Sequence, residues 1–429
     1  MKRSALFVPL LCSVLLTACG QAPMTVPEAS DTVTLEQASM PGDTKPVTEP
    51  TTEPPTAPPP EPTTEPETEP LFMNGRETVE VYEKLTAATL VTDTNAELTD
   101  PEMCFPTDTL GDFTAEIPCR FGGAEQTVTL QYHVADTTPP AAINNGESAA
   151  VKTGGTFNIE DQIGYGDNYD RSPVLTYTGE VNTRTPGVYP IEATLTDASG
   201  NSTTWTVNVT VADKIPAAPS KPQETFAEFT ETFAADNLRF GIDVSKWQSK
   251  VDWPTVRAAG VSFTMIRCGY GSTGMSRDER YYENIKNASA AGLDVGVYFN
   301  STATDPATAR KQADWIVKEI AASGVQTQLP VAFDWESWQK FQQYGINFHE
   351  LNETYNAFAE RLAEHGYETM LYSSLRPLDK VWDTDGRIIW AARYDTTIDY
   401  TGYTIWQQSN TGQVPGINGN VDLDMMIVS

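Results

Sequence analysis

The sequence contains few of the residues that metal-dependent hydrolases and serine hydrolases use for catalysis. Among its 429 residues there are three histidines and five cysteines. His133, His349 and His365 belong to no H-E-x-x-H pattern, and no two cysteines form a C-x-x-C pair. A zinc site built on histidine and a Ser-His-Asp triad are therefore poorly supported. We expect the chain to use no metal and no cofactor, which leaves carboxylate chemistry.

Basic residues are also scarce. There are 28 lysines and arginines against 58 aspartates and glutamates, which gives a formal net charge of −30. An acid excess of this size argues against binding nucleic acid or an anionic membrane surface through charge. We therefore expect no nucleic-acid partner, and we expect a monomer.

The longest N-terminal apolar run, from Ala5 to Leu16, is too short to cross a bilayer as a mature helix. It follows Met1-Lys2-Arg3 and precedes small residues, which is typical of an export signal. Leu16-Thr-Ala-Cys19 also resembles a bacterial lipobox, whose cysteine becomes lipid-modified; ordinary secretion is the alternative. We predict an exported lipoprotein at the outer face of the cytoplasmic membrane or in the cell wall. Its one membrane contact would be the lipid anchor at Cys19.

The length of the chain predicts two to four folded units. Residues 20–72 are rich in Pro, Thr and Glu and have almost nothing to bury, so they predict a disordered, extended tether. Changes in composition divide the rest of the chain. We predict a signal peptide at 1–19, a linker at 20–72 and immunoglobulin-like modules at 73–138 and 139–213. A second linker at 214–237 and a C-terminal catalytic domain at 238–429 follow.

The two predicted modules have short strands of period two, such as residues 127–134 and 204–211. An internal repeat relates them, because Val134-Ala-Asp136 matches Val211-Ala-Asp213. Two β-sandwiches of this length fit, and the end of the first resembles bacterial immunoglobulin-like modules. They predict spacers or weak adhesion modules without chemistry of their own. A disulfide between Cys104 and Cys119 is one option in an exported protein.

The C-terminal domain alternates strand-like runs with helical patterns. Asp305-Pro306 predicts a helix start, as does Asn347 with Glu350 three residues later. The predicted strands are at 239–244, 261–267, 293–299, 329–335, 367–373, 387–392, 403–407 and 421–428. Repeated βα units form a parallel sheet with right-handed crossovers. The fold class we predict is an irregular TIM-like α/β barrel with few helices in its second half, preceded by two all-β sandwiches.

One of these strands ends in a pair of acids, Asp334 and Glu336, two residues apart. Side chains alternate along a strand, so both carboxylates would point the same way. Two acids on one face repel each other, so at least one should keep its proton near neutral pH. Glycoside hydrolysis needs one proton donor and one carboxylate. The alternative is that Asp334 caps a helix and Glu336 is simply solvated.

Several ordered segments of the C-terminal domain together resemble the lysozymes (N-acetylmuramidases) of glycoside hydrolase family 25. They include G-I-D-V-S-K-W-Q at 241–248, D-W-E at 334–336, W-A-A-R-Y at 390–394 and V-D-L-D at 421–424. The resemblance also covers segments at 251–253, 266–271, 291–298, 371–373 and 406–416. It implies cleavage of the β-1,4 bond between N-acetylmuramic acid and N-acetylglucosamine in peptidoglycan glycan strands.

The resemblance also implies roles for individual residues. Glu336 would be the general acid, and Asp334, Asp243 and Asp422 the other acids of the site. Asp334 would orient the substrate acetamido group or stabilise the developing positive charge. Four aromatic residues are candidates for sugar contacts or, alternatively, for the barrel core: Tyr298, Tyr372, Trp390 and Trp406.

The segment after the third predicted strand departs from the family pattern. Many family members have Tyr-His after the third strand, whereas this chain has Tyr298-Phe299-Asn300, which bears on substrate preference. A non-catalytic wall-binding or adhesin-type lipoprotein on a degenerate barrel is the alternative function. The presence of all four acids favours the enzyme. A retaining and an inverting mechanism are equally compatible with the sequence.

Overall fold

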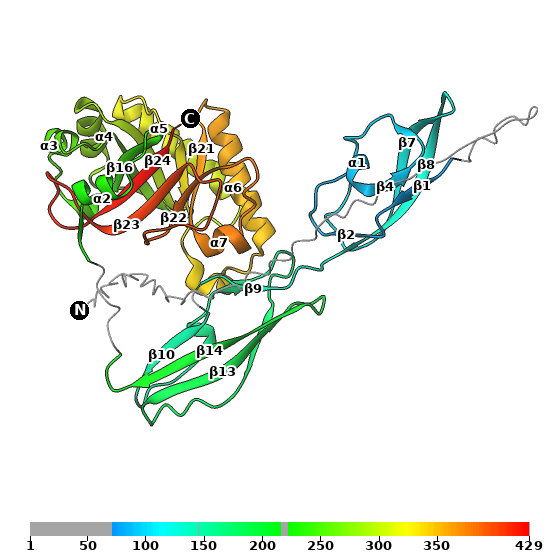
Figure 1. The fold of residues 1–429 in the computed structure, drawn as a ribbon, viewed down its shortest axis with the longest axis horizontal. Helices are drawn as coiled ribbons and strands as arrows, with labels where there is room; N and C mark the ends of the chain where they lie inside the picture. The colour runs from blue at the N-terminus through cyan, green and yellow to red at the C-terminus, as the bar shows by residue number, and fades with distance from the viewer. Residues whose placement is uncertain (1–70, 145, 216–221, 429) are drawn as a thin grey trace, which may run out of the picture.

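The computed structural model describes residues 71–144, 146–215 and 222–428, which form two small all-β modules and a barrel (Figure 1). The predicted signal peptide, the anchor Cys19 and almost all of the first linker lie outside the described residues. No helix in the described ranges is long and apolar enough to cross a membrane.

The first module is built around one long hairpin, β7 (Gly111–Phe121) and β8 (Ala124–Ala135). These strands form a sheet in the order β2-β8-β7-β5, and its core includes Val79, Ile117 and Val134. The shorter elements are β1 (Met73–Gly75), β2 (Thr78–Glu80), β3 (Leu85–Thr86), α1 (Ala87–Leu90), β4 (Val91–Thr94), β5 (Glu97–Leu98) and β6 (Cys104–Phe105). Cys104 is exposed and Cys119 is buried, and both are free thiols. The disulfide considered between these two cysteines is therefore absent.

The second module repeats this plan with the hairpin β13 (Gly187–Thr196) and β14 (Ser202–Ala212). Its sheet has the order β10-β14-β13-β12, with a core of its own that includes Ile191, Val207 and Val209. The other elements are β9 (Ala141–Ala142), β10 (Ser148–Lys152), η1 (Ile159–Asp161), β11 (Tyr165–Gly166) and β12 (Val174–Thr178). Two separate hydrophobic cores confirm the prediction of two all-β units before the barrel.

The C-terminal domain is a closed barrel of eight strands. Its strands pair in the order β23-β22-β21-β20-β19-β17-β16-β24, and pairing of β23 with β24 closes the ring. The strands are β16 (Leu238–Val244), β17 (Phe263–Gly271), β19 (Asp294–Ser301), β20 (Val331–Asp334), β21 (Thr369–Ser374), β22 (Ile388–Ala392), β23 (Ile405–Gln413) and β24 (Val421–Ile427). A short strand, β18 (Met275–Arg277), adds to β17. All eight predicted strands are therefore present.

The helices thin out along the barrel as predicted. Between the strands lie α3 (Trp253–Ala258), α4 (Tyr281–Ala290), α5 (Pro306–Ser323), α6 (Phe348–Ala363) and the six-residue α7 (Leu375–Lys380), with the 3-10 segments η2 (Lys246–Gln248) and η3 (Trp338–Tyr344). Asp305 caps α5 through the Thr308 N–H, and Asn347 and Glu350 form the predicted capping box. The barrel departs from an all-parallel ring at β24, which is antiparallel to both neighbours.

The predicted second linker is wrong for part of its length. Glu224–Thr225 (β15) pairs with β23, and Phe226–Thr232 (α2) follows with a capping box of its own. Phe226 and Phe229 are fully buried against the barrel core. The sequence does not predict this helix, because it has only seven residues and most of them are polar. Its two buried phenylalanines are too few to give a helical pattern.

The second module docks against the barrel. In Figure 1, β9 lies beside the end of the barrel that carries α7, and Arg376 of α7 donates to the Ala142 carbonyl at 2.7 Å. Backbone contact is close at Gly164, where a Cβ would lie 1.6 Å from the Trp338 carbonyl oxygen of η3. Only glycine permits this approach. Because η3 follows the Asp334–Glu336 segment directly, the module packs near the predicted site.

Candidate active site

The predicted acids meet at one end of the barrel. Asp334 is the last residue of β20 and Glu336 lies just beyond it, while Asp243 is near the end of β16. Asp422 is the second residue of β24, and because β24 runs antiparallel to β16, Asp422 lies opposite Asp243. These residues line a cavity of about 200 Å³. The lining residues are Asp243, Ser245, Trp247, Gln248, Arg267, Tyr298, Asp334, Glu336, Tyr372, Trp390, Tyr394, Gln407 and Asp422.

Asp334 and Glu336 form a hydrogen-bonded pair of carboxyl groups. Asn300, which is opposite Asp334 in the β19–β20 register, donates its amide to both: 3.0 Å to Asp334 Oδ2 and 3.4 Å to Glu336 Oε2. Asp334 is buried, whereas Glu336 is exposed at the mouth of the cavity. The pair therefore has one inner carboxyl and one outer carboxyl that is accessible to a ligand.

Both pKa values of this pair are raised. Burial and the negative charge of Glu336 raise the pKa of Asp334 well above its usual range. Desolvation in the barrel mouth raises the pKa of Glu336, while its hydrogen bond with Asp334 and the charge of Arg267 lower it. The two groups titrate together, so one proton is shared between them.

Asp243 is held by a polar chain across the barrel interior. Gln407 donates to Asp243 Oδ2 at 2.6 Å, and the hydroxyls of Tyr372 and Tyr394 each donate to Gln407 Oε1 at 2.9 Å. Burial raises the pKa of Asp243 to about 7, with Gln407 opposing the shift. Gln407 and Tyr394 belong to segments that carried the family resemblance, but the sequence indicated no role for either.

A fifth acid, Asp424, lies beside these groups. It is opposite Gly241 in the β16–β24 register, forms a hydrogen bond with Asp243 and accepts one from the Trp390 indole at 2.9 Å. Burial raises the pKa values of both Asp424 and Asp422 well above their usual range, and the Asp243 charge adds to each shift. The sequence signal was present, because Asp422 and Asp424 are spaced by two on one strand, like Asp334 and Glu336.

Arg267 supplies positive charge to this acidic cavity. It pairs with the buried Asp278 at 2.7 Å and lies opposite Tyr298 in the β17–β19 register. Its charge lowers the pKa values of Asp243, Asp334 and Glu336. A single fixed cation therefore helps to keep part of the acid cluster ionised.

The predicted sugar-contact aromatics divide into two groups. Tyr298, Tyr372 and Trp390 line the cavity. The centroid of the Trp390 ring lies 4.7 Å from that of Tyr372 and 5.9 Å from that of Tyr298. Trp406 is not among the lining residues: it is buried and donates to the Arg393 carbonyl at 2.7 Å. Since Gln407 faces inward, its neighbour on the strand must face outward.

The aromatic ring accessible at the mouth is instead that of Trp247, with 59% of the residue exposed. It follows β16 within η2, where Ser245 caps the turn.

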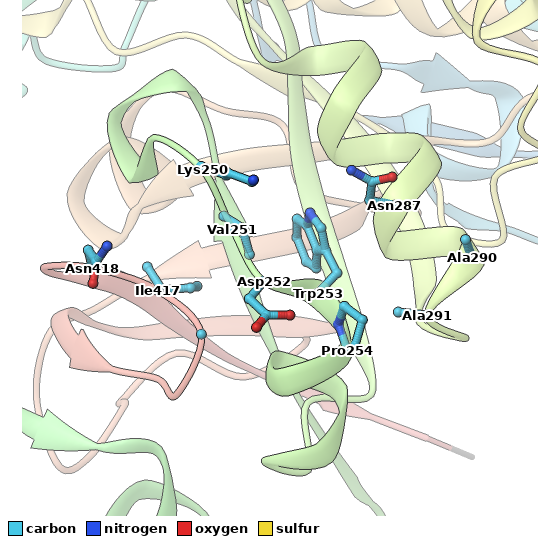
Figure 2. Close-up of a pocket in the computed structure, with 11 residues that line it drawn as sticks. Lys250, Val251, Asp252, Trp253, Pro254, Asn287, Ala290, Ala291, Ile417 and Asn418 are labelled. Carbon is cyan, nitrogen blue, oxygen red and sulfur yellow. The ribbon is translucent and has the colours of Figure 1, made fainter.

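A larger hollow of about 650 Å³ shares no residue with this cavity (Figure 2). It lies beside the start of α3 and the C-terminal end of α4, and Figure 2 shows Asp252, Trp253 and Asn287 on its walls. Asp252, its one carboxylate, caps α3 through the Thr255 N–H. The hollow brings no acids together, so the acid-lined cavity is the candidate active site.

Comparisons with known proteins agree with this geometry. Residues 242–417 match the family model for glycosyl hydrolases family 25. The C-terminal domain is a family 25 domain. Residues 141–211 match the bacterial surface protein Ig-like domain, which corresponds to the second module.

Individual relatives match the family 25 region at modest identity. The chain is 28% identical to Lysozyme M1 of Streptomyces globisporus over 199 residues, 42% of this chain and 65% of that protein. It is 29% identical to the autolytic lysozyme of Clostridium acetobutylicum over 189 residues, 43% of this chain and 54% of that protein. The chain thus spans less than two thirds of either relative. A crystal structure of a bacterial lysozyme from Streptomyces coelicolor is 26% identical, with a TM-score of 0.36 over 43% of this chain and 90% of that one.

Proposed function

We propose that this protein is a peptidoglycan hydrolase, a lysozyme that cleaves the β-1,4 bond between N-acetylmuramic acid and N-acetylglucosamine. The observation that carries the proposal is the pairing of Asp334 with the exposed Glu336 in a cavity with Asp243 and Asp422. Glycosidases need a proton donor and a carboxylate at one site, and the group of acids in this cavity supports both roles. The family 25 match and the two lysozyme relatives support the same substrate class.

In the proposed mechanism Glu336 protonates the leaving glycosidic oxygen. It is the one acid of the pair that is exposed at the cavity mouth, where a glycan strand can reach it. The proton that it shares with Asp334 keeps a donor available in the pair. As the bond breaks, positive charge develops on the sugar ring, and the ionised member of the pair stabilises it.

Asp334 acts on the substrate's acetamido group. A direct nucleophile lies about 5–5.5 Å from the general acid, and an inverting base about 6.5–9.5 Å away. Asp334 and Glu336 are within hydrogen-bond distance, which is closer than either arrangement. A carboxylate in this position suits orienting a neighbouring substrate group, and N-acetylated sugars provide one. We therefore favour an acetamido-assisted reaction.

Sugar binding is assigned to the cavity walls. The exposed ring of Trp247 offers a flat face to a sugar, while Tyr298 and Tyr372 lie deeper. Aromatic faces suit the C–H faces of sugars, and tyrosine hydroxyls add directional partners. The sites at the mouth would hold the glycan strand across Glu336.

The cellular setting follows from the N-terminal region. An export signal with Cys19 as a lipid anchor, followed by a Pro/Thr/Glu-rich tether and two modules, would place the barrel in the cell wall as a monomer. The proposed partners are the glycan strands, with the membrane contacted only through the lipid. The modules act as spacers in this proposal.

The proposal is tested by digesting purified peptidoglycan with the full chain and analysing the soluble muropeptides by mass spectrometry after borohydride reduction. A muramidase produces fragments whose reducing end is N-acetylmuramic acid. Fragments that end in N-acetylglucosamine would identify a different glycosidase. No released fragments, together with retained binding to the wall, would favour the non-catalytic wall-binding alternative.

A further inference from the structure

Three aspartates far apart in the sequence meet where the first module joins the second. Asp136 follows β8, Asp167 follows β11 and Asp197 follows β13. One carboxylate oxygen from each lies within 4.8 Å of the others, and all three residues are buried. This cluster belongs to neither the barrel cavity nor the proposed reaction.

The cluster lacks compensation for its negative charge. Asp136 Oδ1 and Asp167 Oδ1 are buried and accept no hydrogen bond from the protein. Asp167 is also completely inaccessible to solvent, so bulk water does not solvate its charge. Within the described ranges, no lysine, arginine or histidine forms an ion pair with any of the three. Buried carboxylates are costly unless they are paired, hydrogen-bonded or bound to a metal. The two unpartnered oxygens therefore indicate a missing positive ligand.

The remaining contacts hold the carboxylates in place without neutralising them. Ser199 donates to Asp136 Oδ2 at 2.8 Å, and the Tyr169 and Asp170 N–H groups donate to Asp167 Oδ2 at 2.9 and 2.7 Å. Asp136 Oδ1 and Asp167 Oδ1 stay free to bind a ligand, whereas both carboxylate oxygens of Asp197 already accept hydrogen bonds from Asn201.

Two asparagines, Asn168 and Asn201, border the cluster. Asn168 donates to Glu80 of the first module at 3.0 Å, and its own Oδ1 is buried without a partner. Asn201 donates to both the Asp136 carbonyl and the Asp197 carboxylate at 3.0 Å. The three grouped ligands are all carboxylates, without histidine or cysteine, and such a set suits a hard cation such as Ca²⁺ rather than zinc.

We propose that Asp136, Asp167 and Asp197 form a calcium site that fixes the first module to the second. The cation would bridge the strand that ends the first module and two loops of the second. Its effect would extend to the barrel, because the Asp167 carbonyl accepts the N–H of Phe348, the first residue of α6, at 2.7 Å. Calcium would thus stiffen a junction at which all three folded parts meet.

The test uses the full chain stripped with EDTA and titrated with calcium chloride by isothermal calorimetry, with differential scanning calorimetry alongside. The wild-type protein is expected to bind calcium in the ~10⁻⁴–10⁻³ M range of extracellular modules. Saturating calcium should raise the unfolding midpoint of the modules by several degrees. Asp136→Asn should weaken binding at least ~10-fold, since affinity follows the number of charged ligands.

The matched control is Asp213→Asn. Asp213 ends the second module as Asp136 ends the first, but it is exposed. This variant should bind calcium as the wild type does. Asp197→Asn is the second test variant if Asp136→Asn fails to fold in EDTA. Calcium binding that survives both cluster substitutions, or no binding and no midpoint shift in the wild type, would overturn the proposal.

Discussion

Replacing Asp334 by asparagine should change the pH dependence of the reaction in a defined direction. In the wild type, Asp334 and Glu336 share a proton, and the activity on the basic side falls when this last proton leaves. Repulsion between the two carboxylates delays that loss. In Asp334→Asn only Glu336 titrates, without a charged neighbour, so the basic limb should move to lower pH.

The size of the shift follows from the contact between the two groups. Two unit charges about 4 Å apart interact by about 4 kcal/mol at an effective dielectric constant near 20, which corresponds to roughly 3 pKa units. Glu336 is exposed, so water screens part of this interaction. We expect a shift of at least ~1 pH unit, together with a large loss of turnover at every pH. The loss of turnover reflects the missing carboxylate.

The assay is the initial rate of release of soluble fragments from purified peptidoglycan, measured from acidic to alkaline pH. Glu368→Gln is the matched control, since Glu368 is an exposed acid just before β21, at the opposite end of the barrel strands. Its pH profile should coincide with that of the wild type. A basic limb that stays in place or moves to higher pH in Asp334→Asn would refute the shared proton.

Trp247→Ala should weaken substrate binding and raise KM several-fold while the fold stays intact. Trp406→Ala should instead lower the unfolding midpoint, because removing a buried ring lowers the free energy of unfolding by ~3–5 kcal/mol. A raised KM for Trp406→Ala and a lowered unfolding midpoint for Trp247→Ala would contradict the placement of Trp247 at the cavity mouth and of Trp406 in the core. Phe229→Ala should destabilise the barrel by a similar ~3–5 kcal/mol in thermal unfolding, and no change would mean that α2 is only a linker. Cys19→Ala should release the protein from the membrane fraction or stall its processing, and unchanged fractionation would disprove the lipid anchor.

The elements that the sequence predicted well are those fixed by local chemistry. The N-cap at Asp305 and the capping box at Asn347 are set by residues three positions apart, and both are present. The spacing of Asp334 and Glu336 likewise placed two carboxyls together, because alternation along a strand is a local rule. The same rule, applied to Gln407, would have placed Trp406 outside the cavity.

What the sequence could not provide depends on contacts between distant segments. The direction of β24 decides that Asp422 and Asp424 reach the mouth of the barrel, and direction is a property of the closed ring. Asn300 and Glu336 are 36 residues apart, and the donor that bridges the acid pair appears only once β19 lies beside β20. The docking of Gly164 against Trp338 depends on a still longer separation.

The central claim, that Glu336 is the proton donor, is tested most directly by the turnover of Glu336→Gln on purified peptidoglycan, with binding to insoluble wall measured in parallel. Glutamine keeps the shape of the side chain and cannot release a proton to the leaving oxygen. General acid catalysis contributes about 10²–10⁴-fold, so turnover should fall by at least about 10² while wall binding stays within about twofold of the wild type. Turnover close to that of the wild type and of Glu368→Gln would contradict the account and direct attention to Asp243 or Asp422 as the acid.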